Sequence, residues 1–436
     1  MAASLPAWLV VYVFPALLIL GIYIAVKHLA HRKSHNIYKD SVEAGLTEPA
    51  SLHPVIDPAK CLACASCVAA CPEKKIIGLV GGKARLINPT SCVGHGACKE
   101  ACPFDAITLV FGTEKRGVDI PIVKPNFETN VPGIFIAGEL GGMGLIRNAV
   151  RQGAEAMDSI AQHVKNKSSE QLDVVIIGAG PAGISATLGA MHHKLRYVTL
   201  EQDSFGGTVS HYPRGKIVMT APAELPLIGK MQFKETSKES LMEFWTEVKN
   251  KTGLKINTNE RVDKVEQNGN GFTITSSKGT YHSKTILLSI GRRGTPRKLG
   301  VLGEESTKVV YRLVDPGQYR GQKVLIIGGG DSALEAALSI AAEQDTKVAV
   351  SYRSEAFNRA KPKNRDKIQT AINNKKIQVY MKSNVKEIRK DAVLIEQEGN
   401  EFSITNDAVI ISAGGILPTA FLKNIGIEVQ TKFGTA

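Results

Sequence analysis

The sequence predicts an α/β protein with two nested Rossmann-like domains, a small α+β domain and one amino-terminal transmembrane helix. Three observations lead to this fold class. Two segments, Asp173–Gly183 and Lys323–Glu335, read as a β-strand, a glycine-rich turn and the start of a helix. All seven cysteines lie between Cys61 and Cys102. An uncharged run from Ala7 to Val26 is long enough to cross a lipid bilayer.

The composition is that of a globular protein and disfavours nucleic-acid binding. The 436 residues suggest about two to four domains, and 43% of them are hydrophobic. The formal net charge is +13, from 54 basic and 41 acidic residues. The sequence has no recognisable nucleic-acid module, and only 6% of its residues are aromatic. We therefore expect no nucleic acid as a partner, and a basic surface that faces an anionic membrane or an acidic redox partner.

The amino terminus carries the membrane signal. We expect a single-pass anchor at residues 5–27, in which Pro15 is tolerated, and a polar linker at residues 28–54. No basic residue precedes the apolar run, so a cleaved signal peptide fits poorly, and a buried core helix is the remaining alternative. Lys27, Arg32 and Lys33 follow the run. This charge predicts a soluble body on the cytoplasmic side of the cytoplasmic membrane.

The cysteines form two runs. The first is C-x2-C-x2-C-x3-C-P from Cys61 to Pro72, a spacing that holds iron–sulfur clusters. The second repeats this frame from Cys92 to Pro103 but has His95 at its second position. Zinc sites instead pair two C-x2-C knuckles across a longer gap, and disulfides are disfavoured where a cytoplasmic compartment keeps thiols reduced. The two runs therefore indicate iron–sulfur clusters.

Residues 55–111 resemble a bacterial-type two-cluster ferredoxin with one ligand changed. In that family the fourth cysteine of each run crosses to the other cluster. The resemblance therefore implies one 4Fe-4S cluster on Cys61, Cys64, Cys67 and Cys102, and a second cluster on Cys71, Cys92, Cys98 and His95. An imidazole ligand would raise the reduction potential of the second cluster, as in Rieske centres. If the imidazole does not bind, three thiolates would leave a 3Fe-4S cluster, and both alternatives stay open.

The first glycine-rich segment has the complete dinucleotide-binding pattern. Gly178 makes the turn after the strand, Gly180 lets the backbone approach a pyrophosphate, and Gly183 permits close helix packing. Glu201 is the acidic residue expected at the end of the second strand, where it would bind the adenosine ribose. With strand, helix and acid in place, the pattern is a specific signal.

This segment resembles the start of a thioredoxin-reductase-like flavoprotein. Gly207, in Gly206-Gly207-Thr208, matches the next FAD loop of that family. Residues 129–156 look like its closing segment, with Gly138 and Glu139 where relatives place Gly-Asp beside the flavin ribityl chain. A helix then starts near Gly144, and its positive end would stabilise the anion of a reduced flavin. His211 and Tyr212, near the FAD loop, are expected to be surface residues of that loop, and contacts with a substrate are the alternative.

The second glycine-rich segment resembles the nicotinamide-binding domain that this family inserts into its FAD domain. The residues implied for cofactor binding are Gly328, Gly330 and Ser332, together with Arg353 and Arg359. The second strand ends without an acid, so the two arginines would meet a 2′-phosphate, which favours NADPH over NADH. Surface cations are the alternative for both arginines. Two unrelated Rossmann units are also an alternative, but residues 287–293 and 410–418 match the family's crossover strands.

The order of the segments predicts a circular permutation, because the closing segment precedes the rest of the FAD domain. The expected ranges are 115–165 for the closing segment, 171–294 for the FAD domain, 295–402 for the NAD(P) domain and 403–436 for the return to the FAD domain. A truncated flavoprotein beside an unrelated copy is the alternative. It would leave sheet edges uncovered, which disfavours it.

No cysteine follows Cys102, so the dithiol with which thioredoxin reductases act on proteins is absent. The resemblance then implies an NAD(P)H-dependent FAD and iron–sulfur oxidoreductase that exchanges electrons, in either direction, with an external partner. Quinone, ferredoxin, flavodoxin and cytochrome are all compatible partners. No side-chain acid, base or nucleophile is required, and relatives are commonly homodimers. A disulfide-type reductase acting directly at FAD and a membrane-tethered redox sensor are the alternatives.

Overall fold

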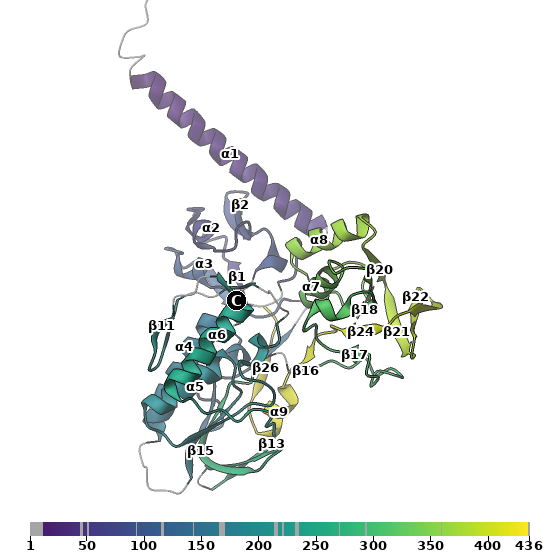
Figure 1. Cartoon of the computed structure of the whole chain (residues 1–436). Helices are drawn as coiled ribbons and strands as arrows, with labels where there is room; N and C mark the ends of the chain where they lie inside the picture. The colour runs from purple at the N-terminus through teal and green to yellow at the C-terminus, as the bar shows by residue number, and fades with distance from the viewer. Residues whose placement is uncertain are drawn as a thin grey trace, which may run out of the picture. The chain divides into compact units, whose positions relative to one another are not determined.

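The structure is a computed structural model of the chain (Figure 1). It describes residues 12–43, 47–49, 52–92, 94–114, 117–142, 144–164, 171–212, 217–219, 222–231, 235–269, 271–292, 294–358 and 360–434. The chain divides into two compact units. One contains residues 1–114 with 434–436, and the other contains residues 115–433.

The first unit joins a long helix to a small α+β domain. In that domain β1 pairs with β4 and β2 pairs with β3, both antiparallel. Its core combines buried isoleucines, such as Ile77 and Ile107, with the cysteines Cys61, Cys67 and Cys98. The elements of the unit are α1 (Phe14–Glu43), β1 (His53–Ile56), α2 (Ser66–Ala70), β2 (Ile77–Val80), β3 (Lys83–Leu86), α3 (Ala97–Glu100) and β4 (Ile107–Val110).

Helix α1 extends further than the sequence pattern suggested. Residues 28–43, expected to belong to a linker, continue the helix to Glu43, because no glycine or proline interrupts residues 22–43. Residues 5–11 of the expected anchor lie outside the described residues. Within the described part of the chain, α1 is the one helix long and apolar enough to span a membrane. A signal sequence near an amino terminus passes the same test.

The second unit contains a flavoprotein-type sheet of six strands. Central strand β15 pairs with β7 and β6, both in parallel, and with β14 in antiparallel fashion. β7 reads LDVVII and is buried after its first residue, as expected for a strand covered on both faces. Helices α4 and α5 pack so closely that a Cβ at Gly153 would strike the carbonyl oxygen of Ala182. The bounds are β6 (Ile134–Ile136), α4 (Ile146–His163), β7 (Leu172–Ile177), α5 (Pro181–His192), β8 (Tyr197–Leu200), α6 (Lys238–Thr252), β13 (Val262–Asn268), β14 (Gly271–Ser276) and β15 (Thr280–Leu288).

A pair of strands joins the two ends of this unit. β5 (Val118–Pro121) lies antiparallel to β26 (Val429–Lys432), so that Val118 is opposite Lys432. The Arg292 guanidinium donates to the carbonyl oxygen of Asp119 at 3.0 Å. Segments about 300 residues apart in the sequence therefore lie side by side.

A second, all-parallel sheet forms the nicotinamide-type domain. Its strand order is β17-β24-β18-β19-β20, and a separate antiparallel sheet contains β21, β22 and β23. The expected boundary at residue 403 is wrong for β24, which pairs with β17 and β18 and so belongs to this sheet. The chain crosses between the two domains where β16 pairs with β25. The bounds are β16 (Thr295–Pro296), β17 (Val309–Val310), β18 (Lys323–Ile327), α7 (Asp331–Ile340), β19 (Lys347–Tyr352), α8 (Pro362–Asn373), β20 (Ile377–Met381), β21 (Ser383–Ile388), β22 (Ala392–Gln397), β23 (Asn400–Thr405), β24 (Ala408–Ile411), β25 (Gly415–Ile416) and α9 (Thr419–Asn424).

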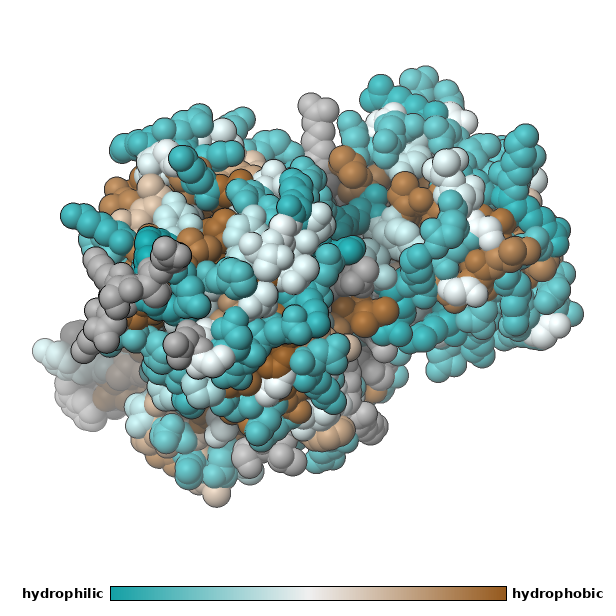
Figure 2. Space-filling view, turned by 90° about the horizontal axis from the view of Figure 1, so that it is seen from below, coloured by the Kyte–Doolittle hydropathy of each residue, from teal (hydrophilic) through white to brown (hydrophobic). Residues whose placement is uncertain are grey.

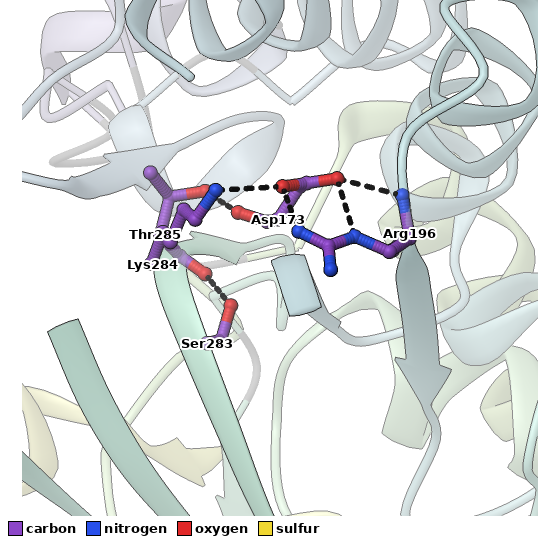
Figure 3. Close-up of polar contacts among 5 residues, drawn as sticks. All are labelled: Asp173, Arg196, Ser283, Lys284 and Thr285. Atoms are coloured by element: carbon purple, nitrogen blue, oxygen red, sulfur yellow. Dashed lines mark hydrogen bonds and ion pairs between the residues drawn. The ribbon is translucent and has the colours of Figure 1, made fainter. Parts of the chain in front are cut away.

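A buried carboxylate joins three strands of the first sheet. Asp173 of β7 lies between Arg196, just before β8, and Lys284 of β15 (Figure 3). Its carbonyl oxygen also accepts a hydrogen bond from the Thr285 hydroxyl at 2.7 Å. On the outside, one face of the molecule is mainly hydrophilic with small separate hydrophobic patches (Figure 2).

Candidate functional site

The first glycine-rich turn lies at the carboxyl ends of parallel strands, where α/β sheets bind ligands. Gly178 follows β7 with a φ of 102°, and a Cβ there would lie 2.6 Å from the carbonyl oxygen of Ser289. A Cβ at Gly183 would collide with the carbonyl oxygen of Gly178. Nothing lies within 4 Å of the Cβ position of Gly180, so the backbone there is open to a ligand. The cradle fits the pyrophosphate of a dinucleotide.

Two further predicted residues lie beside this turn. Glu201 follows β8 and is buried, and its carboxylate accepts hydrogen bonds from the backbone N–H groups of Ala179 at 2.7 Å and Asp203 at 3.0 Å. Burial raises the pKa of Glu201, although both N–H groups act in the opposite direction. A Cβ at Gly207 would lie 2.9 Å from the Cα of Gly180, so the two glycine loops are in contact.

The predicted closing segment, residues 115–165, also contacts the first glycine-rich turn. Gly138 follows β6 with a φ of 84°, and a Cβ there would lie 3.0 Å from the Cβ of Ala182 in α5. Its N–H donates to the side chain of Gln152 at 2.9 Å. Glu139 is exposed, and its carboxylate lies near Gly144, just before α4 begins. The structure thus brings Gly138 and the start of α4 to the first glycine turn.

The second glycine-rich turn joins β18 to α7. A Cβ at Gly328 would lie 2.4 Å from the carbonyl oxygen of Ser412, so the turn leaves no room for a side chain there, whereas nothing lies within 4 Å of the Cβ position of Gly330. Ser332 is exposed in the first turn of α7, and Arg353 is exposed just after β19, the strand beside β18. Arg359 lies outside the described residues.

Sequence reasoning missed a polar cluster at this second turn. Asp331 accepts hydrogen bonds from the backbone N–H of Lys361 and from Asn364, both at 2.8 Å. The Nη1 of Arg365 is buried without a hydrogen-bond partner among the described residues. Burial lowers the pKa of Arg365, and Asp331 and Asp366 act in the opposite direction. The basic residues around Pro362, a proline at the first turn of α8, were the available signal.

The seven cysteines and His95 separate into two sets. One cavity is lined by Cys61, Cys64, Cys67 and Cys102. The other is lined by Cys71, Cys92, Cys98 and His95. All seven thiols are free of disulfides. Among the described residues no three His, Cys, Asp or Glu side chains come together to hold a single metal ion. Four donors around a cavity suit a multi-atom cluster better than one ion.

Backbone N–H groups prepare the set of Cys61, Cys64, Cys67 and Cys102 for thiolate sulfur. The Ala84 N–H donates to the Cys61 Sγ, and the Ala106 N–H donates to the Cys102 Sγ, both at 3.4 Å. Such hydrogen bonds stabilise negative sulfur in a cluster. Burial raises the pKa of the Cys67 and Cys98 thiols to about 11, and neighbouring thiols add to the shift. These thiols therefore need the positive charge of iron to ionise at neutral pH.

His211 is more than a loop surface residue. Its Nε2 lies 2.9 Å from the Asp203 carboxylate, which also pairs with Arg312 at 3.4 Å. Burial lowers the pKa of His211 and the Arg312 cation adds to this, while Asp203 acts in the opposite direction. This cluster links the FAD loop to a residue of the range assigned to the nicotinamide domain.

Comparisons with known proteins agree with both parts of the chain. Residues 175–434 match the pyridine nucleotide-disulphide oxidoreductase family, and residues 53–103 match a 4Fe-4S dicluster domain. A ferredoxin–NADP reductase from Ignicoccus hospitalis is 27% identical over 60% of this chain and 83% of its own length. The bacilliredoxin reductase Bdr of Bacillus subtilis is 26% identical over 61% of this chain and 83% of its own length. The solved structure of bacillithiol disulfide reductase Bdr (YpdA) from Staphylococcus aureus, 27% identical, covers 60% of this chain and 82% of its own, with a TM-score of 0.53.

Fold and site together define an NAD(P)H-dependent oxidoreductase that uses FAD and iron–sulfur clusters. The chain belongs to the pyridine nucleotide-disulphide oxidoreductase family, and it carries a 4Fe-4S dicluster domain in addition. This confirms the predicted α/β class, the ferredoxin resemblance and the expected cofactors, FAD, NAD(P)H and iron–sulfur clusters.

Proposed function

We propose that the protein is a membrane-anchored oxidoreductase that passes electrons from NADPH, through FAD and two 4Fe-4S clusters, to an external acceptor. The observation that carries this proposal is the division of eight donors between two cavities, in a chain with no cysteine beyond Cys102. FAD supplies the conversion of a hydride pair into single electrons, and each cluster carries one electron at a time. Without a dithiol near the nicotinamide domain, the clusters are the exit for these electrons.

The residues proposed for each cofactor combine the geometry above with the resemblance found in the sequence. For FAD we propose the cradle of Gly178, Gly180 and Gly183, with the buried Glu201 at the adenosine ribose. For the nicotinamide cofactor we propose the turn at Gly328 and Gly330 together with Ser332, and for its 2′-phosphate Arg353 and Arg359. The unpartnered Nη1 of Arg365 supports a negatively charged ligand at this turn, since a buried cationic donor needs an acceptor. For the clusters we propose the two sets that line the cavities, with His95 as a ligand.

We also propose that the FAD domain is circularly permuted. The parallel pairing of β6 with β15 supports this, because it inserts residues 134–136 into the sheet formed by later strands. The antiparallel pairing of β5 with β26 supports it too, since it places the start of the closing segment beside the last strand of the chain.

The continuity of α1 supports the membrane anchor over a cleaved signal sequence. A signal peptide ends at a cleavage site of small residues soon after its apolar stretch. Here the helix runs on to Glu43, and its second half packs against the cluster domain. Cleavage after the apolar stretch would cut within a packed helix. The charge that follows the stretch supports a body on the cytoplasmic side.

Anaerobic reduction by NADPH, followed by electron paramagnetic resonance (EPR), tests the proposed electron path. We expect the flavin to bleach and two reduced cluster signals to appear. A bleached flavin beside clusters that stay oxidised would refute the path.

A disulfide-type reductase acting directly at FAD is the second candidate, because the chain is similar to two Bdr proteins. The two candidates differ in their need for clusters. Cys64→Ser would remove one cluster ligand that is exposed and distant in sequence from the flavin cradle. If turnover of a small disulfide, such as oxidised bacillithiol, survives this change undiminished, the second candidate is correct.

A further inference from the structure

The second half of α1 is fixed to the cluster domain. The face formed by His31, Ser34, Tyr38 and Ser41 recurs at helical spacing, and Ser41 is 7% exposed. Helix α1 contacts β2 within the same unit, and Figure 1 shows β2 beside the helix. Because the helix is held at Ser34 and at Tyr38, one turn apart, its second half cannot swing like a flexible tether.

Two contacts define this attachment. A Cβ at Gly78 of β2 would lie 2.7 Å from the Ser34 Oγ, so helix and strand approach as closely as a glycine and a serine allow. The Arg85 guanidinium of β3 lies over the Tyr38 ring, 5.9 Å from its centre, in a cation–π contact. Small residues set the distance, and the cation–π pair stabilises the orientation.

The attachment begins close to the end of the apolar stretch. Ser34 is eight residues beyond Val26, which is about 12 Å along a helix. The head-group layer on one side of a bilayer is roughly 5–7 Å thick. If the apolar half spans the membrane, the β2–β3 hairpin therefore lies just outside the head groups, with no hinge between it and the lipid.

The cluster domain also has an apolar opening. Leu62 and Phe104 line the cavity of Cys61, yet these residues are 65% and 41% exposed. Cys64, in the same cavity, is exposed as well. Exposed apolar side chains beside a redox centre suit a flat apolar molecule better than a hydrated ion.

We propose that α1 is a rigid strut that holds the cluster domain at the membrane surface, where the Cys61 cavity reduces a lipid-soluble quinone. This inference rests on the proposed function and specifies its acceptor. A soluble protein can reach an exposed cluster at any height, so it gains nothing from rigid mounting, whereas a quinone is confined to the bilayer. The reaction balances as one NADPH, one solvent proton and one quinone giving NADP⁺ and one quinol, with two electrons crossing one at a time.

The test uses the full chain in phosphatidylcholine–phosphatidylglycerol vesicles that contain ubiquinone-10, with NADPH oxidation measured anaerobically. Ser34→Leu overfills the contact with Gly78, while Asn36→Leu, on an exposed position of the same helix, is the matched control. We expect Ser34→Leu to lower quinone reduction about tenfold or more, because a loose domain loses its fixed position relative to the acceptor. The control should keep the wild-type rate.

Reduction of ferricyanide, a water-soluble acceptor, separates the possible failures. The rate of ferricyanide reduction should be the same in wild type, Ser34→Leu and Asn36→Leu. An unchanged rate of quinone reduction in Ser34→Leu would refute the role of α1 as a rigid strut. If wild-type protein in vesicles reduces a soluble ferredoxin, flavodoxin or cytochrome but leaves the quinone oxidised, quinone is not the acceptor. If NADPH reduces neither ferricyanide nor the clusters seen by EPR, the proposed function itself fails. If Ser34→Leu loses its clusters, Arg85→Met tests the strut instead. Arg85 is exposed and contacts Tyr38, so its substitution should lower the rate of quinone reduction in the same direction but by less.

Discussion

Asp173→Asn tests how the sheet that carries the FAD cradle is held together. The Asp173 side chain is 2% exposed and lies 3.0 Å from the Arg196 Nη2 and 3.2 Å from the Lys284 Nζ. It also accepts a hydrogen bond from the backbone N–H of Arg196 at 3.0 Å. Asparagine keeps the shape of the side chain but removes its negative charge. Its NH₂ group is a donor, and it would replace a carboxylate oxygen that accepts from Arg196 or Lys284.

The contacts give an expected magnitude. A hydrogen bond to a charged group contributes about 1.5–3 kcal/mol. The Arg196 and Lys284 side chains are 39% and 18% exposed, so water partly replaces what they lose. We therefore expect the substitution to lower the free energy of unfolding by about 3 kcal/mol. This is the lower end of the roughly 3–5 kcal/mol that a protein loses when one partner of a buried ion pair is removed. For a domain of this size the melting temperature should fall by roughly 6–12 °C.

The pH dependence has a definite sign. Burial alone would raise the pKa of Asp173, but Arg196 and Lys284 more than offset it, and the pKa lies below its ordinary value of 3.8. A carboxylate with a lowered pKa in the folded state stabilises the protein above its ordinary pKa, and this contribution is lost as the pH falls through the folded-state pKa. The difference between wild type and Asp173→Asn should therefore be complete at neutral pH and shrink below about pH 4.

Flavin fluorescence, which rises when FAD is released on heating, reports the unfolding of this domain. Asp263→Asn is the matched control, since Asp263 pairs with Arg261 at 2.7 Å but is 41% exposed. The control should change stability by less than about 1 kcal/mol. Equal melting temperatures for wild type and Asp173→Asn, or a difference that persists unchanged in acid, would refute the reasoning.

Three further predictions concern the cofactors. His95→Cys should keep both clusters and lower the reduction potential of one, because a thiolate is negative where imidazole is neutral; EPR-monitored redox titration measures this, and an unmoved potential would mean that His95 is not a ligand. Gly183→Ala should abolish FAD binding, seen as loss of the flavin absorbance, because its Cβ has no room against Gly178; Gly180→Ala should leave the fold intact, since its Cβ meets no protein atom, but should weaken FAD binding because the methyl group enters the space proposed for the pyrophosphate. Arg353→Ala should raise the KM for NADPH about tenfold or more and leave that for NADH nearly unchanged, because only NADPH carries a 2′-phosphate; equal effects on the two would contradict that role.

The cysteine runs and glycine turns were predictable because each imposes a local constraint. Gly178 has a φ of 102°, which other residues rarely adopt, and its Cβ position is filled by backbone. The C-x2-C-x2-C run fixes which thiols share a cavity through its spacing. Such features depend on neighbours in the sequence, so the pattern shows them directly.

Features that depend on distant contacts were not visible. Residues 28–43 look like a polar linker because their helix packs a serine and a tyrosine, rather than an apolar stripe, on the hairpin. β24 has a buried AVII pattern that suits either nucleotide domain, and only its pairing with β18 assigns it. The partners of Asp331, at Lys361 and Asn364, lie about 30 residues away in the sequence.

The β5–β26 pair is a suitable site for the proposed permutation and for joining the cluster domain to the chain. Opening a domain requires a site where its two new ends lie at the surface in ordinary secondary structure. The β5–β26 pair meets this requirement, because Val118 and Lys432 are opposite each other at the ends of an antiparallel pair. A chain cut there leaves both strands paired, so the sheet edge that a truncation would expose stays covered. In the chain order, the cluster domain is joined just before β5, at the start of the segment that leads on to Gly138 and α4. Under the proposed function, the permutation lets one continuous segment connect the cluster ligands to the closing segment of the FAD domain.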